Sequence, residues 1–317
     1  MTTMTEPTTH TLDVPGAVLT YDVRPAAPGS APVLLLIGSP MGASGFGTLA
    51  GHFPDRTVVT YDPRGVERST KADPTSPSTP EQHADDLHRV VAALDAGPVD
   101  VFASSGGAVN ALALVAKHPE QVRTLVAHEP PLASILPDRE GALAVCRAIS
   151  DSYQQRGFGA GMAHFIATVS HKGPIDADFA AQPSPDPGMF GLPTEDDGNR
   201  RDPLLGQNIL SSTSFEPDFA GLQAASTRIV IGAGVESEGE MAHRGAVALA
   251  ERLGMTPIRF PSNHGGFLGG EYGQTGDPEG FAATLREVLS ESRRTGEGTT
   301  TTRGVGLGPF MSAMNCW

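Results

Sequence analysis

"VDVFASSGGAVNALALVAKHP", residues 99–119, joins a β-branched apolar run to a helical pattern through two serines and two glycines. A short apolar run that ends in a turn is typical of a buried strand, and the residues after it repeat at helical spacing. Ala103, Ser105 and Gly107 occupy the first, third and fifth places of the small-x-Ser-x-Gly turn that presents a nucleophile between a strand and a helix. The stretch therefore predicts a sharp strand-to-helix turn.

Steric crowding decides which of the two serines is the candidate nucleophile. In such a turn the residues two places before and after the nucleophile have room for no more than a methyl group. Choosing Ser104 would put the phenyl ring of Phe102 at a crowded place, so Ser105 is the predicted nucleophile. Gly106 follows at the helix N-terminus, where a backbone N–H lacks an intrahelical partner, and is the predicted oxyanion donor. The alternative is a glycine-rich helix start whose serines only cap the helix.

The rest of the chain alternates short β-rich runs with helical patterns. Several of the β-rich runs are apolar almost throughout, as strands buried on both faces are. The order predicts the α/β fold class, a doubly wound, mostly parallel sheet with helices on both faces. Predicted strands cover residues 17–23, 31–38, 56–62, 99–104, 122–129, 227–234 and 256–260, and predicted helices lie near 43–52, 80–95, 107–118, 217–226, 239–254 and 278–291.

Residues 131–215 interrupt this alternation, because they contain no convincing strand and their first half has a helical apolar period. A structureless loop of that length is uncommon inside a compact domain. We interpret residues 131–215 as a helical cap or lid inserted between two parts of one core, residues 11–130 and 216–292. Residues 293–317 are predicted to be a disordered C-terminal tail. Five apolar residues of the cap are candidates for the lining of a pocket, namely Phe158, Phe165, Ile166, Phe179 and Phe190.

Composition narrows the function classes. The 317 residues are 39% hydrophobic, so the chain can bury a sizeable core. It contains 22 Lys and Arg residues and 36 Asp and Glu residues, which gives a net charge of -14. This balance, without a basic stripe, argues against nucleic acid as a partner. No segment reaches about 18 uninterrupted apolar residues and no secretion signal is visible, so no membrane partner and a cytoplasmic location are expected. Cys146 and Cys316 have no metal-ligand spacing, and neither a metal nor another cofactor is expected.

The partners that Ser105 would need follow later in the chain. His264 lies in the loop of "TPIRFPSNHGGFLG" (residues 256–269), just past a predicted strand, where an exposed imidazole can accept the serine proton. A carboxylate should orient that imidazole. Glu236, two residues past the predicted strand 227–234, is the expected acid, because the loop at the carboxyl edge of the sheet reaches toward both partners.

Other carboxylates stay open as the acid. Glu238 and Glu240 are near Glu236, and Glu240 lies in a first helical turn, where the helix dipole alone explains a glutamate. Glu129, at the end of the preceding predicted strand, can also reach the histidine.

A second oxyanion donor is expected in the loop "GSPMGASGF", residues 38–46. Proline has no N–H, so Pro40 cannot donate. The N–H of Ser39 is the expected donor, and that of Met41 is the alternative.

Taken together, the strand order, the serine turn and the two loop residues resemble the α/β-hydrolase fold superfamily over residues 11–291. "YDPRGVERS" (61–69) resembles the Asp-x-Arg-Gly-x-Gly-x-Ser segment of that family, and "HPEQVRTLVAHEPP" (118–131) resembles the helix end and strand after its serine turn. Asp62 and Arg64 are then interpreted as structural residues that order the loops beneath the site. The sequence departs from the family pattern at three places: Ile37 replaces a histidine, and Ala103 and Glu67 each replace a glycine.

These observations favour a serine hydrolase that cleaves a carboxylic ester, or a related small acyl substrate, through an acyl-enzyme intermediate. A thioester, a lactone, a peracid or a carbon-carbon bond as the point of cleavage also fits the same residues. One alternative is a non-catalytic member of the fold that binds a small ligand. Another is a dinucleotide-binding oxidoreductase, since "GFGTLA" (45–50) matches Gly-x-Gly-x-x-Ala, although these glycines come too late after the strand.

Overall fold

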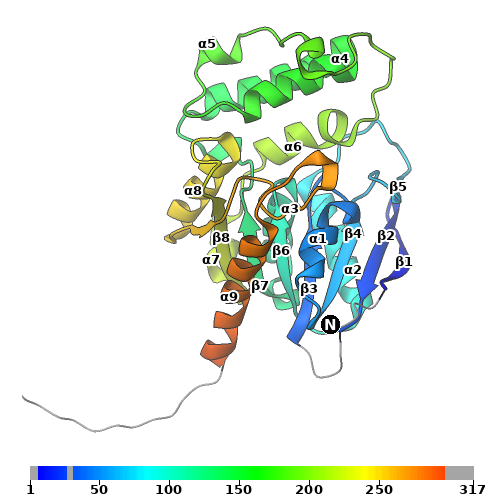
Figure 1. Ribbon diagram of the computed structural model, residues 1–317, viewed down its shortest axis with the longest axis vertical. Helices are drawn as coiled ribbons and strands as arrows, with labels where there is room; N and C mark the ends of the chain where they lie inside the picture. The colour runs from blue at the N-terminus through cyan, green and yellow to red at the C-terminus, as the bar shows by residue number, and fades with distance from the viewer. Residues whose placement is uncertain (1–5, 27–30, 297–317) are drawn as a thin grey trace, which may run out of the picture.

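The computed structural model describes residues 6–26 and 31–296, with side chains up to Ser290. A single sheet forms its centre, in the order β1-β2-β4-β3-β6-β7-β8-β9, with β5 paired to β2 (Figure 1). The neighbouring strands β4, β3, β6, β7, β8 and β9 pair in parallel, whereas β2 pairs antiparallel with β1, β4 and β5. The strands are β1 (Thr8–Val14), β2 (Ala17–Arg24), β3 (Ala31–Ile37), β4 (Arg56–Asp62), β5 (Thr70–Lys71), β6 (Val99–Ser104), β7 (Val122–His128), β8 (Arg228–Gly234) and β9 (Ile258–Phe260).

Helices cover both faces of the sheet, which confirms the predicted fold class. Helices α2, α3, α7 and α8 share one apolar cluster with the strands, and α1 and α9 share the other. The helices are α1 (Gly47–Gly51), α2 (Pro80–Leu94), α3 (Gly106–Lys117), α4 (Arg139–Val169), α5 (Ala177–Ala180), α6 (Ile209–Ser214), α7 (Phe219–Ala224), α8 (Met241–Leu253) and α9 (Pro278–Gly296). The 3₁₀-helices are η1 (Ala43–Phe46), η2 (Pro119–Gln121), η3 (Ala133–Ile135), η4 (Pro187–Phe190) and η6 (Glu271–Gly273), and η5 (Pro203–Asn208) is a π-helix.

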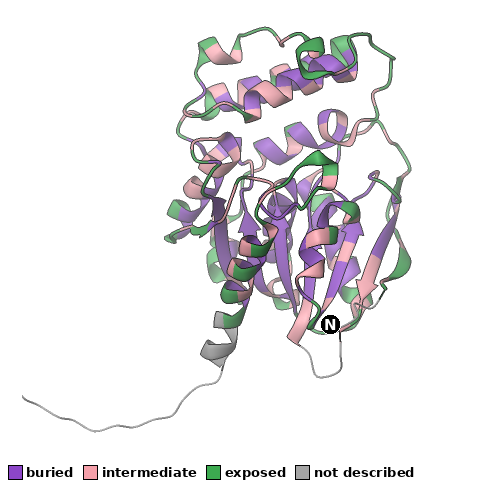
Figure 2. Cartoon of the chain, in the orientation of Figure 1, coloured by how far each residue is buried: buried purple, intermediate pink, exposed green. Residues whose placement is uncertain are grey.

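Most residues of the central strands β3, β6 and β7 are buried, as expected for strands that helices cover on both faces (Figure 2). In β6 the side chain of Val101 belongs to one apolar cluster and that of Phe102 to the other. Successive residues of a strand point to opposite faces, so both faces need apolar residues when helices cover both.

Residues 131–215 contain the helices α4, α5 and α6, joined by loops and shorter helical turns, and no strand. Helices α4, α5 and α6 lie beyond one end of the sheet, above α3 in the view of Figure 1. Helix α4 is interrupted at Gly157, whose φ of 82° is in the left-handed region that glycine adopts without strain. We call residues 131–215 the cap.

Two strands were not predicted, β1 and the short β5. Most of β1 is exposed, so it lacks the apolar alternation that identifies a strand from sequence. Helix α9 extends to Gly296, past the predicted start of the tail at residue 293. The rest of the predicted tail lies outside the described residues, and so does Cys316.

Candidate active site

The turn at Ser105 has the strained geometry that its sequence predicts. Ser105 has φ 56° and ψ −129°, a backbone conformation that is costly for a residue with a side chain. Its N–H donates to the carbonyl of His128 at 3.0 Å, which ties the turn to the end of β7. Ser104 lies in β6 and is buried, whereas Ser105 sits at the point of the turn and is half-buried. Strain of this kind is found where surrounding contacts fix the backbone, often at functional sites.

The glycines after Ser105 are required by a neighbour that the local sequence does not reveal. A Cβ on Gly107 would lie 2.8 Å from the Cα of Gly38, and one on Gly106 would lie 2.5 Å from the carbonyl oxygen of Ser39. Both contacts are made with the loop after β3, which is hydrogen-bonded next to β6. The two predicted oxyanion donors, on Ser39 and Gly106, therefore belong to backbone segments in van der Waals contact.

His264 lies where the sequence predicts it, just past β9, but its carboxylate partner differs from the expected one. The Nδ1 atom of His264 is 2.7 Å from Oε2 of Glu129, the first residue after β7. Glu236 does not reach the imidazole; it is exposed, and its Oε2 accepts a hydrogen bond from Ser262 at 3.2 Å. The expectation that Glu236 holds His264 is therefore wrong, because the loop after β8 turns its side chain to the surface.

The other two carboxylates considered do not bond to His264 either. Glu240 precedes α8 and lines the cavity described below, and Glu238 is exposed.

Glu129 is held in place from three sides. Its Oε1 accepts hydrogen bonds from the N–H of Gly234, at 2.8 Å, and from the hydroxyl of Ser237, while Oε2 faces His264. Glu129 is fully buried. Burial opposes ionisation, but the hydrogen bond with His264, the nearby histidines and Ser237 together lower the pKa of Glu129 to about 2. The carboxylate therefore stays ionised at neutral pH, where it can stabilise a positive charge on the imidazole.

The sequence contains a signal that favours Glu129 over Glu236, but it becomes visible only when the ends of two neighbouring strands are compared. The neighbouring strand β8 ends in Gly232, Ala233 and Gly234. A Cβ on Gly234 would lie 2.7 Å from Oγ of Ser237, so only glycine leaves room for the contacts around the carboxylate. In this protein, the sequence signal is the combination of a glutamate just past β7 and glycines at the end of the neighbouring β8.

Ser105 and His264 both line one cavity of about 530 Å³. It lies between the carboxyl ends of the strands, where ligands bind in open α/β sheets, and the cap. The core contributes Ser105, His264, Gly106, Ser39 and Met41, and the cap contributes Cys146, Ile149, Phe165, Leu204, Ile209 and Thr213.

Of the five predicted cap residues, Phe165 alone lines this cavity. Phe158 packs against the cluster around Tyr153, and Phe179 packs against the cluster around Val145. Phe190 is 38% exposed, and Ile166 is half-buried without facing the cavity.

Asp62 and Arg64 make the structural contacts expected of them. Asp62 accepts hydrogen bonds from the N–H of Ala43, at 2.8 Å, and from Nε of Arg68, at 2.6 Å. Arg64 donates two hydrogen bonds to Asp86, at 2.7 and 2.6 Å. Neither side chain lines the cavity, so both order the loops around it.

Only one group among the described residues places three potential metal-ligating atoms within 4.8 Å of one another: His128, Glu129 and His264. Two of the three already share a 2.7 Å hydrogen bond. Ligand atoms about 2 Å from a tetrahedral metal ion lie about 3.3 Å apart, so these two would have to give up their hydrogen bond and separate to hold such an ion. The geometry favours proton transfer over metal binding.

In the helices of residues 6–26 and 31–296 we find none long and apolar enough to cross a membrane.

Comparisons with known proteins agree with this architecture. The α/β hydrolase fold family matches residues 31–172. The uncharacterized hydrolase YraK of Bacillus subtilis (strain 168) is 32% identical over 290 residues, which cover 90% of this chain and 97% of YraK.

Solved structures give the same picture. The enol-lactonase from Burkholderia xenovorans LB400 superposes with a TM-score of 0.63 at 17% identity, over 89% of this chain and all of that one. A thermophilic esterase from Thermogutta terrifontis superposes with a TM-score of 0.60 at 18% identity, over 90% of this chain and 99% of that one. At such identities the likeness concerns the fold, and the relative at 32% identity extends it to the sequence. The chain belongs to the α/β-hydrolase fold family.

Proposed function

We propose that this protein is a serine hydrolase that cleaves uncharged carboxylic esters through an acyl-enzyme intermediate, with Ser105, His264 and Glu129 as its triad. The observation that carries the proposal is the 2.7 Å contact between the buried Glu129 carboxylate and Nδ1 of His264. The same cavity is lined by His264 and by Ser105 in its strained turn. A nucleophile, a base and a group that orients the base are the parts that this chemistry needs.

The chemical steps follow from this arrangement. Oγ of Ser105 attacks the carbonyl carbon of the ester while its proton passes to Nε2 of His264. The carbonyl oxygen becomes an oxyanion, and the N–H groups of Gly106 and Ser39 are the proposed donors to it. Such a donor is worth about 2.7 to 4 kcal/mol in the transition state.

Collapse of this intermediate breaks the ester bond, and the leaving alcohol takes the proton from His264. Water then attacks the acyl-enzyme, giving one proton to His264, and the carboxylic acid leaves as the Ser105 hydroxyl is restored. Glu129 keeps the proton of the neutral imidazole on Nδ1 and stabilises the imidazolium that forms in each half.

The lining of the cavity supports an uncharged substrate. Among the described residues around it, none is a lysine or an arginine, and the one carboxylate is that of Glu240. Burial and the nearby charge of Glu129 raise the pKa of Glu240. A substrate carboxylate would meet no positive side chain here, whereas apolar acyl and alcohol groups can pack against Ile149, Phe165 and Ile209.

Replacing the nucleophile tests the proposal. Ser105→Ala should lower kcat for p-nitrophenyl butyrate by about a million-fold, the loss typical of removing such a serine. Ser104→Ala is the matched control: this buried neighbour also lines the cavity but has no place in the triad, so activity should stay within about tenfold of the wild type. The wild-type protein should also be labelled at Ser105 by a fluorophosphonate, as found by mass spectrometry of its peptides. Activity of Ser105→Ala within about tenfold of wild type would refute the assignment.

A panel of substrates then separates the remaining reaction types. An ester, a thioester and a lactone of the same carbon number should be compared by kcat/KM, and we expect the ester to be preferred. Folded wild-type protein that no fluorophosphonate labels would instead support the non-catalytic, ligand-binding alternative.

A further inference from the structure

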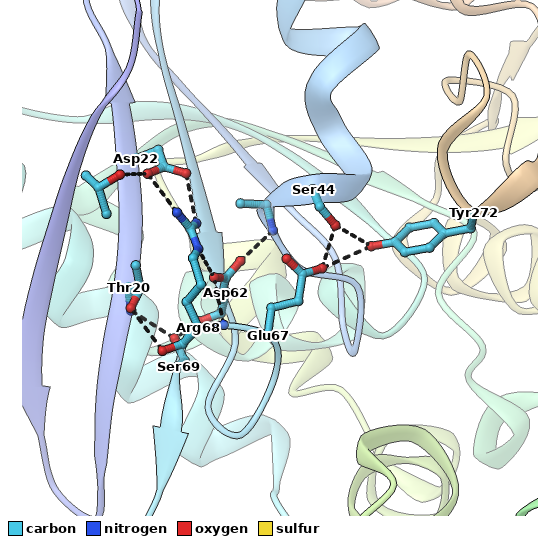
Figure 3. Close-up of polar contacts among 10 residues, drawn as sticks. Thr20, Asp22, Ser44, Asp62, Glu67, Arg68, Ser69 and Tyr272 are labelled. Carbon is cyan, nitrogen blue, oxygen red and sulfur yellow. Dashed lines mark hydrogen bonds and ion pairs between the residues drawn. The ribbon is translucent and has the colours of Figure 1, made fainter.

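Three side chains from distant parts of the chain meet at one side of the cavity. Ser44 lies in η1, Glu67 in the turn after β4, and Tyr272 in η6. Oε1 of Glu67 accepts hydrogen bonds from Oγ of Ser44, at 2.6 Å, and from the Tyr272 hydroxyl, at 3.2 Å. The two hydroxyl oxygens are 3.0 Å apart. Figure 3 shows Glu67 and Ser44 both directed toward the end of the Tyr272 side chain. We call these three residues the Glu67 cluster.

Tyr272 forms part of one side of the cavity, and few other side chains pack against it. Tyr272 lines the cavity, yet the residue is 57% exposed. Its ring approaches Gly45, where a Cβ would lie 3.1 Å from Cε2 of Tyr272. With this much exposure, apolar packing contributes little to fixing the ring, so the hydrogen bonds of its hydroxyl group determine where it lies.

The backbone of the cluster is strained at two places. Glu67 has φ 44° and Tyr272 has φ 53°, both in the left-handed region that favours glycine. Glu67 also stands where the resembling family segment has a glycine. Residues in this conformation persist when other contacts compensate for the strain, and such positions are common at binding sites. The contacts that Glu67 makes here are those with Ser44 and Tyr272.

The loop that carries Tyr272 is anchored independently of the cluster. The carboxylate of Glu271 accepts hydrogen bonds from the N–H groups of Thr48, at 2.8 Å, and Gly269, at 2.7 Å. A bridge between Gly269 and Thr275 closes the base of the loop. Loss of the cluster would therefore free the Tyr272 ring while leaving the loop attached to α1.

We propose that Tyr272 is a specificity-determining residue that closes one side of the cavity and limits the length of the substrate, and that Ser44 and Glu67 are positioning residues that hold its ring in place. The inference rests on the proposed function, because the cavity it limits is the one that contains Ser105 and His264. It adds to that function a limit on substrate length on the side of the cavity where Tyr272 lies, set by a hydrogen-bonded and displaceable side chain.

Chain-length profiles test the proposal. The wild type, Tyr272→Ala and Tyr272→Phe are compared on p-nitrophenyl esters from butyrate to decanoate, and in their labelling rates with fluorophosphonates of the same alkyl lengths. Each methylene that a longer cavity buries is worth about fourfold in affinity. Tyr272→Ala should therefore raise the decanoate-to-butyrate ratio of kcat/KM by at least about tenfold, which needs two further methylenes. Tyr272→Phe keeps the ring but frees it, and should give a smaller rise.

The positioning role has its own test at Glu67. Glu67→Gln keeps an oxygen acceptor for both hydroxyl groups, and its profile should stay that of the wild type. Glu67→Gly removes the acceptor and relieves the left-handed strain, so its profile should move toward that of Tyr272→Phe while its melting temperature does not fall. A residue with a merely structural role would not separate specificity from stability in this way. Tyr21→Phe, in β2 and outside the cavity lining, is the distant control.

The outcomes distinguish this inference from the proposed function. If the wild type hydrolyses esters and is labelled at Ser105, but Tyr272→Ala keeps the wild-type profile, the chain-length inference is wrong and the proposed function stands. An equal loss of selectivity in Glu67→Gln and Glu67→Gly would overturn the positioning role. If no ester is hydrolysed and Ser105 is not labelled, the proposed function fails and this inference fails with it.

Discussion

Exchange of Glu129 for glutamine tests the contact on which the proposed triad depends. In the wild type, Oε1 of Glu129 accepts from Gly234 and Ser237, and Oε2 is paired with Nδ1 of His264. Glutamine has a single oxygen. The N–H of Gly234 is a fixed donor, so the amide oxygen must stay on that side and the amide NH₂ must face His264.

This arrangement forces the wrong form of the imidazole. An NH₂ group opposite Nδ1 makes Nδ1 an acceptor, so the imidazole proton moves to Nε2, the nitrogen that would otherwise accept the proton of Ser105. Removing the carboxylate from such a triad lowers kcat by about 10⁴-fold, which corresponds to about 5 kcal/mol of transition-state stabilisation. Because Glu129 does not line the cavity, KM should change little.

The assay is the hydrolysis of p-nitrophenyl butyrate at neutral pH, with thermal unfolding of each variant to establish that it folds. Glu236→Gln is the matched control, since this exposed carboxylate bonds to Ser262 and not to His264. Its kcat should stay within about twofold of the wild type, as expected for a surface substitution. The reasoning is refuted if folded Glu129→Gln keeps kcat within about tenfold of wild type, or if Glu236→Gln loses as much as Glu129→Gln.

Three further predictions concern stability and charge selectivity. Burial lowers the pKa values of His83 and His128 from 6.5 to about 4. The unfolded chain therefore binds protons below pH 6.5 that the folded chain does not. As the pH falls from 6.5 to 4, each histidine should lower the free energy of unfolding, measured by urea denaturation, by up to about 3 kcal/mol. A free energy of unfolding that stays constant over this pH range would contradict the prediction. Glu240→Gln should raise kcat/KM about fivefold for an ester with a carboxylate in its acyl chain, relative to a neutral ester of equal length. This magnitude assumes that the two charges lie about 8 Å apart at an effective dielectric constant of about 40. An unchanged ratio would show that the charge of Glu240 does not disfavour anionic substrates. Gly107→Ala puts a methyl group 2.8 Å from backbone atoms of the loop after β3 and should destabilise the fold by about 1 to 3 kcal/mol in thermal unfolding. Gly47→Ala, whose new methyl would meet nothing closer than 3.6 Å, is its control and should unfold like the wild type.

Much of the fold was predictable because its signals are local. The strands β3, β4, β6 and β7 come from short β-rich runs between turns, and each predicted run agrees with its strand to within one residue. Strand β1 was not predicted, because most of its side chains are exposed and its sequence therefore has no apolar pattern that indicates a strand. The choice of Ser105 over Ser104 also needed no more than local crowding, since a phenyl ring cannot occupy the narrow place in the turn.

The partners of the site depend on contacts that the sequence order does not contain. Glu129 and Glu236 both follow strand ends in the right part of the chain. Which one meets His264 depends on the glycines at the end of β8 and on the loop that sends Glu236 toward Ser262. Glu67 and Tyr272, 205 residues apart, likewise meet only through packing. The sequence by itself therefore determined most of the sheet and the sharp turn, and it singles out Ser105 as the proposed nucleophile, because these follow from periodicity and sterics between near neighbours. The tertiary structure decided the carboxylate at His264 and the wall of the cavity, because these depend on which side chains the completed sheet brings within hydrogen-bonding distance.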